Sequence, residues 1–239
     1  MTVKIVSLFP DVLGTYGDHG NARILAHLVR LAGRTCELTA VGINDVVPLD
    51  GDLYLLGGGE DGPQALAARR LADGSPLHRV VERNRPILAV CAGYQVLGRS
   101  FVAEGTTLPG LGLLPIDSVR GRARMVGEVL MTPFAPIGQS LMTGFENHGG
   151  QTILDSDCQP LGRVYRGAGN GGDGHDGIVH GSIVGSYLHG PILARNPGLA
   201  LWLLSRIGVD VSDVPAHHWR LYEERVRASE GALWTRRRA

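Results

Sequence analysis

The sequence predicts an α/β fold in which a parallel β-sheet is flanked by helices. Short apolar runs of strand length alternate with segments whose apolar residues recur at helical spacing. A glycine cluster and a cysteine each follow directly after one of these runs. Strands buried on both faces of a sheet give such continuous apolar runs, and turns are expected where they end.

The first half of the chain alternates predicted strands with predicted helices. The predicted strands span residues 3–8, 36–41, 53–56 and 87–90. The predicted helices span residues 22–31, 64–71 and 77–83. This order favours right-handed crossovers and places the functional crevice at the carboxyl ends of the strands.

The second half is predicted to be a largely antiparallel elaboration, followed by helices. The predicted strands of this elaboration span residues 125–131, 162–165 and 178–180, and residues 183–188 are a further predicted strand. A helix is expected over residues 196–207, with Pro197 in its first turn. Residues 1–239 are predicted to form one domain, with a core over about 3–207 and a C-terminal helical extension over 208–239. We expect the extension to end as a solvated helix with a frayed basic end at Arg236–Arg238, in preference to a docking surface.

Composition argues against several classes of function. The 23 Lys and Arg residues balance the 23 Asp and Glu residues, so no overall field favours nucleic acid or an anionic membrane. No apolar stretch approaches the ~18 residues of a membrane span, and no signal-peptide pattern follows Met1. Three widely spaced cysteines argue against a disulfide framework. A cytoplasmic location is expected.

Cys91 has the setting of a catalytic nucleophile. It ends the apolar run 87–90 and is followed by the small residues Ala92 and Gly93, then by residues read as a helix through Phe101. A strand, a tight turn with a nucleophile and a helix start together form a nucleophile elbow. The helix N-terminus would favour the reactive thiolate. The alternative is a buried structural cysteine.

A thiol nucleophile needs a base and donors for the developing oxyanion. His189 is the best placed of nine histidines because it lies at the end of the predicted strand 183–188; His148 is the competitor. The glycines 57–59 could offer backbone N–H groups to an anion or could simply turn the chain. No cluster with the spacing of a metal site is present in the sequence, so no metal is expected.

Several of these segments together resemble the CobB/CobQ-like group of class I glutamine amidotransferases, which implies a flavodoxin-like fold. They also resemble, within that group, the GatD-type glutaminase subunits of lipid II isoglutaminyl synthases. The segments are residues 57–59, 91–95, 145–150 and 186–193.

The resemblance implies a role for particular residues. Cys91 would be the nucleophile, His189 the base and Arg124 the contact to substrate glutamine. The backbone N–H groups of Gly59 and Ala92 would form the oxyanion hole, and Gln95 would contact the substrate. Many class I relatives carry a Glu two residues after the histidine, where this chain has Pro191. A carboxylate elsewhere in the chain, or one from a partner, must therefore orient the imidazole.

The resemblance also implies a division of labour. This chain would hydrolyse L-glutamine without a cofactor and deliver ammonia to a MurT-like ligase subunit in a heterodimer. That partner would hold ATP and magnesium, with zinc as a further candidate, and would amidate D-glutamate of lipid II to D-isoglutamine in peptidoglycan biosynthesis. No nucleic acid and no direct membrane insertion are expected. The alternatives are an amidotransferase for corrinoid synthesis, and a non-catalytic or redox-sensing flavodoxin-like protein.

Overall fold

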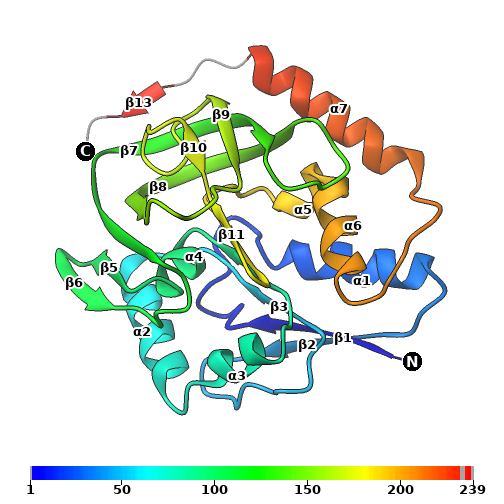
Figure 1. The fold of residues 1–239 in the computed structure, drawn as a ribbon, viewed down its shortest axis with the longest axis horizontal. Helices are drawn as coiled ribbons and strands as arrows, with labels where there is room; N and C mark the ends of the chain where they lie inside the picture. Colours follow the sequence, from blue (N-terminus) through cyan, green and yellow to red (C-terminus); the bar gives the residue numbers. More distant parts are fainter. Residues whose placement is uncertain (1, 232–234, 238–239) are drawn as a thin grey trace.

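A computed structural model describes residues 2–231 and 235–237 of the chain. A six-stranded sheet forms its centre (Figure 1). The order across this sheet is β2 (Cys36–Val41), β1 (Val3–Leu8), β3 (Leu53–Leu56), β4 (Ile87–Val90), β12 (Ile183–Ser186) and β11 (Ile178–His180). All neighbours pair in parallel except β11, which is antiparallel to β12. The predicted parallel sheet is confirmed, and the order of its parallel strands is that of flavodoxin-like folds.

Helices pack on both faces of this sheet. The chain moves from β1 to β2 in one direction across the sheet and from β3 to β4 in the other, so right-handed crossovers put their helices on opposite faces. One layer contains α1 (Gly20–Leu31), α5 (Ile192–Arg195) and α6 (Pro197–Ser205). The other contains α2 (Asp61–Ala72), α3 (Pro76–Glu82) and α4 (Ala92–Val96). The strands β3 and β4 between the layers are completely buried.

A second, mostly antiparallel sheet covers one end of the first (Figure 1). Its strands are β5 (Ser100–Ala103), β6 (Thr106–Pro109), β7 (Ile116–Pro133), β8 (Met142–Leu154), β9 (Gly162–Arg166), β10 (His175–Asp176) and β13 (Thr235–Arg237). The expected antiparallel elaboration is therefore present, but residues 178–180, predicted to belong to it, instead form β11 at the edge of the central sheet. Strand β7 is also far longer than the predicted strand 125–131. Its pairing with β8 loses register between Arg120 and Met125. Such an irregularity re-aims side chains, and it bends this part of β7 over the end of the central sheet.

The helix that follows Cys91 is shorter than predicted. It ends at Val96, and Phe101 lies in strand β5. The carbonyl groups of Val96 and Leu97 accept hydrogen bonds from the backbone of residues 111–114 and not from a further helical turn. The apolar spacing that suggested a longer helix arises instead because both segments face the same core.

The C-terminal prediction is partly wrong. Helix α7 (Ala216–Gly231) is present, but residues 235–237 form a strand antiparallel to residues 124–126 of β7. The prediction of a helix with a frayed basic end therefore fails there, because β7 offers an edge that an extended segment can pair with. Arg238 lies outside the described residues.

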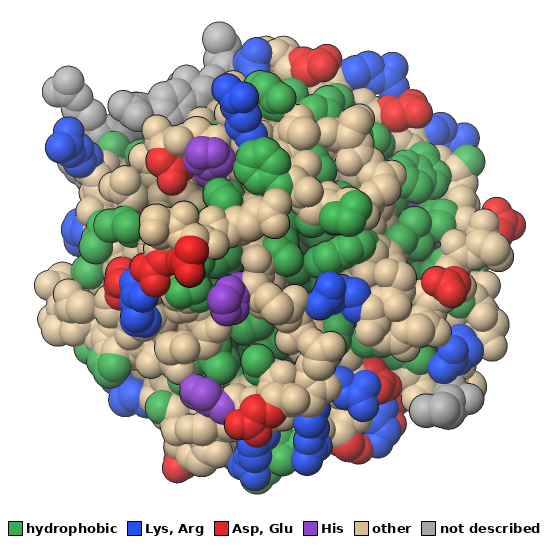
Figure 2. All heavy atoms as spheres, in the orientation of Figure 1, with side chains coloured by type: hydrophobic (Ala, Val, Ile, Leu, Met, Phe, Trp, Pro, Cys, Tyr) green, Lys and Arg blue, Asp and Glu red, His purple; other side chains and the backbone are tan. Residues whose placement is uncertain are grey.

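The surface agrees with the balanced composition. On the face shown in Figure 2, Lys and Arg side chains are interspersed with Asp and Glu side chains. Among the described residues, no helix has the length and apolar character needed to cross a bilayer.

Candidate active site

Cys91 lies in a sharp turn between β4 and α4. Its backbone has φ 50° and ψ −107°, a conformation that a non-glycine residue rarely adopts. Two backbone hydrogen bonds hold the turn: the N–H of Cys91 donates to the carbonyl of Ser186 at 2.9 Å, and that of Gly93 to the carbonyl of Gly57 at 3.1 Å. The turn has the strained strand–nucleophile–helix geometry of a nucleophile elbow.

The glycine turn after β3 lies against the same cysteine. A Cβ atom at position 58 would stand 2.6 Å from Cε1 of His189 and 3.2 Å from Cβ of Cys91. Only glycine therefore lets these two side chains approach each other across the turn. The N–H of Gly58 donates to Oδ2 of Asp18 at 2.9 Å.

His189 follows β12 and is fully buried. Its backbone is held by two hydrogen bonds with Phe145 of β8, of 2.9 and 3.1 Å. Its Nδ1 lies 2.9 Å from Oδ2 of Asp18, and both side chains are about 1% exposed. The structure thus brings Cys91 and His189 together, as predicted, and supplies the orienting carboxylate from the same chain.

Asp18 is a site residue that the sequence reasoning missed. It lies in the loop between β1 and α1, which leaves the carboxyl end of a parallel strand at the edge where Cys91 also lies. Its position after the predicted strand 3–8 could have indicated a role in the site, because loops at the carboxyl ends of parallel strands share one crevice.

The electrostatics of the site favour a charged imidazole. Burial lowers the pKa of His189, but the hydrogen bond to Asp18 and the neighbouring Cys91 outweigh burial and raise that pKa to about 10. The Nε2 atom has no conventional hydrogen-bond partner among the residues described. This nitrogen is therefore available to exchange a proton with the Cys91 thiol and with the leaving group of a reaction there.

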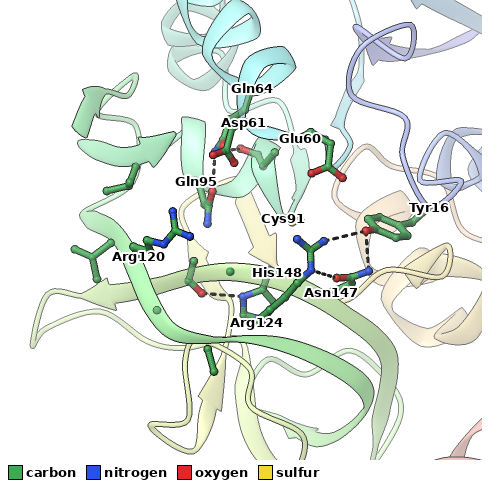
Figure 3. A pocket seen from close by; sticks show the side chains of 18 residues that line it. Tyr16, Glu60, Asp61, Gln64, Cys91, Gln95, Arg120, Arg124, Asn147 and His148 are labelled. Carbon is green, nitrogen blue, oxygen red and sulfur yellow. Dashed lines mark hydrogen bonds between the residues drawn. The ribbon is translucent and has the colours of Figure 1, made fainter. Parts of the chain in front are cut away.

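A cavity of about 350 Å³ opens above Cys91 (Figure 3). Gly59 and Ala92 line it beside the cysteine, as an oxyanion hole would require, whereas the N–H of Gly58 is already engaged by Asp18. The role of Gly59 and Ala92 as donors stays a prediction.

Arg124 enters the same cavity from the irregular part of β7. Its Nε donates to Oδ1 of Asn147 at 2.7 Å, and its guanidinium lies 3.4 Å from the hydroxyl of Tyr16. Asn147 also donates to that hydroxyl, at 2.7 Å (Figure 3). Tyr16 was not singled out from the sequence, and Asn147 appeared there only within the segment 145–150.

Gln95 lines the cavity, and both ends of its side-chain amide are hydrogen-bonded. Its Oε1 accepts from Gln64 at 2.6 Å, and its Nε2 donates to the hydroxyl of Tyr187 at 2.8 Å. These two bonds tie Gln95 into the wall of the cavity. Contact with a substrate stays a prediction for this residue.

The competing histidine is engaged elsewhere. His148 is buried on β8, stacks on Tyr187 with ring centroids 3.7 Å apart, and donates from Nδ1 to the carbonyl of Gly150 at 2.8 Å. Its Nε2 lies 3.6 Å from the buried carboxylate of Glu146. Its hydrogen bond is thus to Gly150, with Glu146 as a close neighbour, and it lines the cavity wall.

The cavity also carries charges of both signs. Glu60 and Asp61 lie on one side and Arg120 and Arg124 on the other. Asp61 accepts a hydrogen bond from the backbone of Glu104, which leaves Glu60 as the acid without a bonded partner in the described part of the chain. No group of three or more His, Cys, Asp or Glu residues suited to a metal ion occurs among the described residues.

Solved structures with this fold include glutamine amidotransferases. The chain superposes on a structure of PurLQS from Thermotoga maritima with a TM-score of 0.56 at 16% identity, covering 95% of this chain and 99% of that one. A glutamine amidotransferase from the same organism gives a TM-score of 0.55 at 16% identity, covering 95% of this chain and 92% of that one. Likenesses at this identity establish the fold alone.

Sequence comparison is more specific. The chain is 36% identical over 212 residues to the lipid II isoglutaminyl synthase (glutamine-hydrolyzing) subunit GatD of Staphylococcus aureus, covering 85% of this chain and 84% of that protein. It is 31% identical to the GatD subunit of Streptococcus pneumoniae, covering 93% and 88%. Residues 4–197 match the model of the CobB/CobQ-like glutamine amidotransferase domain. The chain therefore belongs to the family of CobB/CobQ-like glutamine amidotransferases.

Proposed function

We propose that this chain hydrolyses L-glutamine through a thioester on Cys91 and serves as the glutaminase subunit of a lipid II isoglutaminyl synthase. One observation carries the proposal. Asp18 is hydrogen-bonded to the buried His189, His189 lies beside Cys91, and Cys91 lines the same cavity as Arg124.

The chemistry follows from these groups. The Cys91 thiolate attacks the side-chain carboxamide carbon of glutamine, and the N–H groups of Gly59 and Ala92 hold the tetrahedral oxyanion. Protonated Nε2 of His189 donates its proton to the leaving nitrogen, so the C–N bond breaks and ammonia departs. Water, activated by the now neutral His189, then attacks the γ-glutamyl thioester and releases glutamate and the thiol.

Charge on the cavity walls would select the zwitterion of the amino acid. Arg124 would bind the α-carboxylate as a planar fork, and its Nε donates to Asn147. Glu60 lies across the cavity and would face the α-ammonium group. Asparagine would present its amide one methylene too short to reach Cys91 from the same anchors.

Ammonia released into water is wasted, so a partner that consumes it is part of the proposal. The GatD relatives match this chain over 84% and 88% of their own length. Matched cobyric acid synthases are covered over only 35% and 34% of theirs, which favours the GatD-type assignment over the corrinoid one. The partner would be a MurT-like ligase in the cytoplasm that holds ATP and magnesium, as well as any zinc, and activates D-glutamate of lipid II for amidation.

The test is active-site labelling with 6-diazo-5-oxo-L-norleucine, alone and with the co-expressed ligase. We expect one adduct, at Cys91, that L-glutamine prevents and D-glutamine does not. The Glu60→Gln variant should need more L-glutamine for the same protection. Labelling at Cys36 or Cys158, or labelling that glutamine does not slow, would contradict the proposal. If no MurT-like protein co-purifies, the proposed role as a synthase subunit would be wrong, whereas the proposed glutaminase activity would stand.

A further inference from the structure

Tyr16 connects the two halves of the candidate site. Its ring packs against His189 with ring centroids 4.7 Å apart and planes inclined by 52°. Its hydroxyl accepts from Asn147 at 2.7 Å and lies 3.4 Å from the guanidinium of Arg124. One side chain thus contacts the catalytic imidazole through its ring and the carboxylate-binding pair through its hydroxyl. Figure 3 shows the hydroxyl contacts.

The backbone at Tyr16 is held in an unfavourable conformation. Its φ of +66° lies in the left-handed region, which is unfavourable for a non-glycine residue. The preceding residue, Thr15, forms a bridge to Gly58 beside the catalytic pair, and Asp18 follows two residues later. The loop is thus anchored on both sides of Tyr16 by contacts to the site, which keeps the ring over His189.

Packing alone does not explain this placement. The side chain is 38% exposed and lines the cavity, so it buries little apolar surface compared with a core tyrosine such as Tyr54. Its contacts are instead made to residues with a proposed chemical role.

We propose that Tyr16 is a positioning residue that couples the binding of glutamine at Arg124 to the orientation of His189. The hydroxyl holds Asn147 and Arg124 in place for the α-carboxylate, and the ring fixes the plane of the imidazole. This inference rests on the proposed glutaminase function, but its two contacts can be removed separately.

The Tyr16→Phe variant removes only the hydroxyl. We expect the KM for L-glutamine to rise about 5- to 20-fold, as for the loss of one hydrogen bond to a charged or strongly polar pair, with kcat within twofold of the parent. The Tyr16→Leu variant also removes the ring, and we expect its kcat to be at least 10-fold lower than that of Tyr16→Phe. Assays use the chain together with its co-purified ligase, and circular dichroism checks that both variants are folded.

A substrate without the carboxylate separates a specific effect from a general one. With 4-aminobutanamide, which keeps the amide and the amine, Tyr16→Phe should match the parent, because Arg124 has nothing to bind. Tyr16→Leu should still be slow. The matched control is Tyr165→Phe, which loses a hydroxyl bonded to Thr132 on an exposed strand and should leave both parameters unchanged.

Binding provides a readout that does not need turnover. In the Cys91→Ser background, adding Tyr16→Phe should weaken L-glutamine binding by the same 5- to 20-fold factor in calorimetry. Equal binding with and without the hydroxyl would overturn the role of Tyr16, as would identical kinetics of the Phe and Leu variants. No binding of L-glutamine to Cys91→Ser at all would overturn the glutaminase proposal itself.

Discussion

The Asp18 carboxylate changes what a fully buried histidine can do. Burial alone would favour the neutral imidazole at position 189, but the hydrogen bond from Nδ1 to Asp18 and the nearby Cys91 reverse that preference. Because Asp18 also accepts the N–H of Gly58, its position is fixed by backbone and not by side chains alone. The imidazole is thereby held in one orientation, with Nε2 free for chemistry.

Replacing Asp18 tests this arrangement at the scale of one residue. We expect Asp18→Asn to reduce kcat for glutamine hydrolysis by roughly 10²- to 10⁴-fold, because the amide neither fixes the tautomer nor stabilises the imidazolium. The upper limb of the pH–rate profile should move to lower pH, since the pKa of His189 loses a cause that raises it. Ammonia release over pH 6–10 measures both effects. Asp50→Asn, which removes an exposed partner of Lys4, is the control.

The same pair makes a prediction about stability. The pKa of His189 is raised from 6.5 to about 10 in the folded protein, so its contribution is fully present below pH 6.5 and is lost as the pH rises through 10. The difference in free energy of unfolding between the parent and Asp18→Asn should therefore shrink over this range. Urea titrations at pH 6, 8 and 10 measure it, and a difference that grows with pH would contradict the assignment.

At the scale of elements, two turns at the end of one sheet build the site. The turn after β3 and the turn after β4 approach so closely that the residue between them cannot carry a side chain. The carbonyl of Gly57 accepts from Gly93, so the two turns are also bonded to each other. Neighbouring parallel strands end at the same edge, which makes such a meeting of turns a direct result of the topology.

Gly58→Ala tests the packing of these turns. The new methyl group would meet Cε1 of His189 at 2.6 Å and Cβ of Cys91 at 3.2 Å, and both are held by backbone hydrogen bonds. We expect kcat to fall at least ~100-fold, at a cost to stability of about 1–3 kcal/mol, as is usual for overpacking. Gly62→Ala in the same segment is the control, because its methyl would have only one side-chain atom nearby, at 3.5 Å. Unchanged activity of Gly58→Ala would contradict this prediction, because it would show that Cys91 and His189 still react when a methyl group pushes them apart.

At the scale of the whole molecule, a partly buried ion pair joins helix α5, which packs on the central sheet, to strand β7 of the second sheet. Arg195 of α5, which follows the loop of His189, makes two hydrogen bonds of 2.5 and 3.1 Å to Glu128 of β7. Ser229 of α7 lies 3.4 Å from the same carboxylate. The pair therefore connects the segment after His189 to the strand that carries Arg124, and it also contacts the C-terminal helix.

Breaking this pair should destabilise the molecule without touching the reaction centre. Arg195→Met leaves Glu128 largely buried and without its partner, and we expect a loss of about 2–4 kcal/mol in the free energy of unfolding. The double variant with Glu128→Gln should recover part of that loss. Arg227→Met, which removes an exposed contact to Glu223, should change stability by less than ~0.5 kcal/mol. Urea unfolding of the four proteins measures these differences.

Local sequence was sufficient for four of the six strands of the central sheet. The strands β1, β2, β3 and β4 lie at the predicted positions. For β1, β3 and β4 the reason is that a strand buried on both faces needs a continuous apolar run, whereas β2 is an edge strand and mostly exposed. Cys91 and the glycine turn could be placed at one edge for the same reason. His189 could be placed only at the end of a probable strand, and the resemblance to a family was needed to prefer it to His148.

Tertiary structure decided the rest, because the remaining partners are brought together only by long-range pairing. Asp18 and His189 are 171 positions apart, and Tyr16 and Asn147 are 131 apart. The length of β7, its break in register and the strand at residues 235–237 depend on hydrogen bonds to distant segments, so no local pattern encodes them. The spacing of apolar residues shows which face of a segment packs against the core. It does not show which residue from a distant segment will lie opposite in the cavity, because that depends on the complete fold.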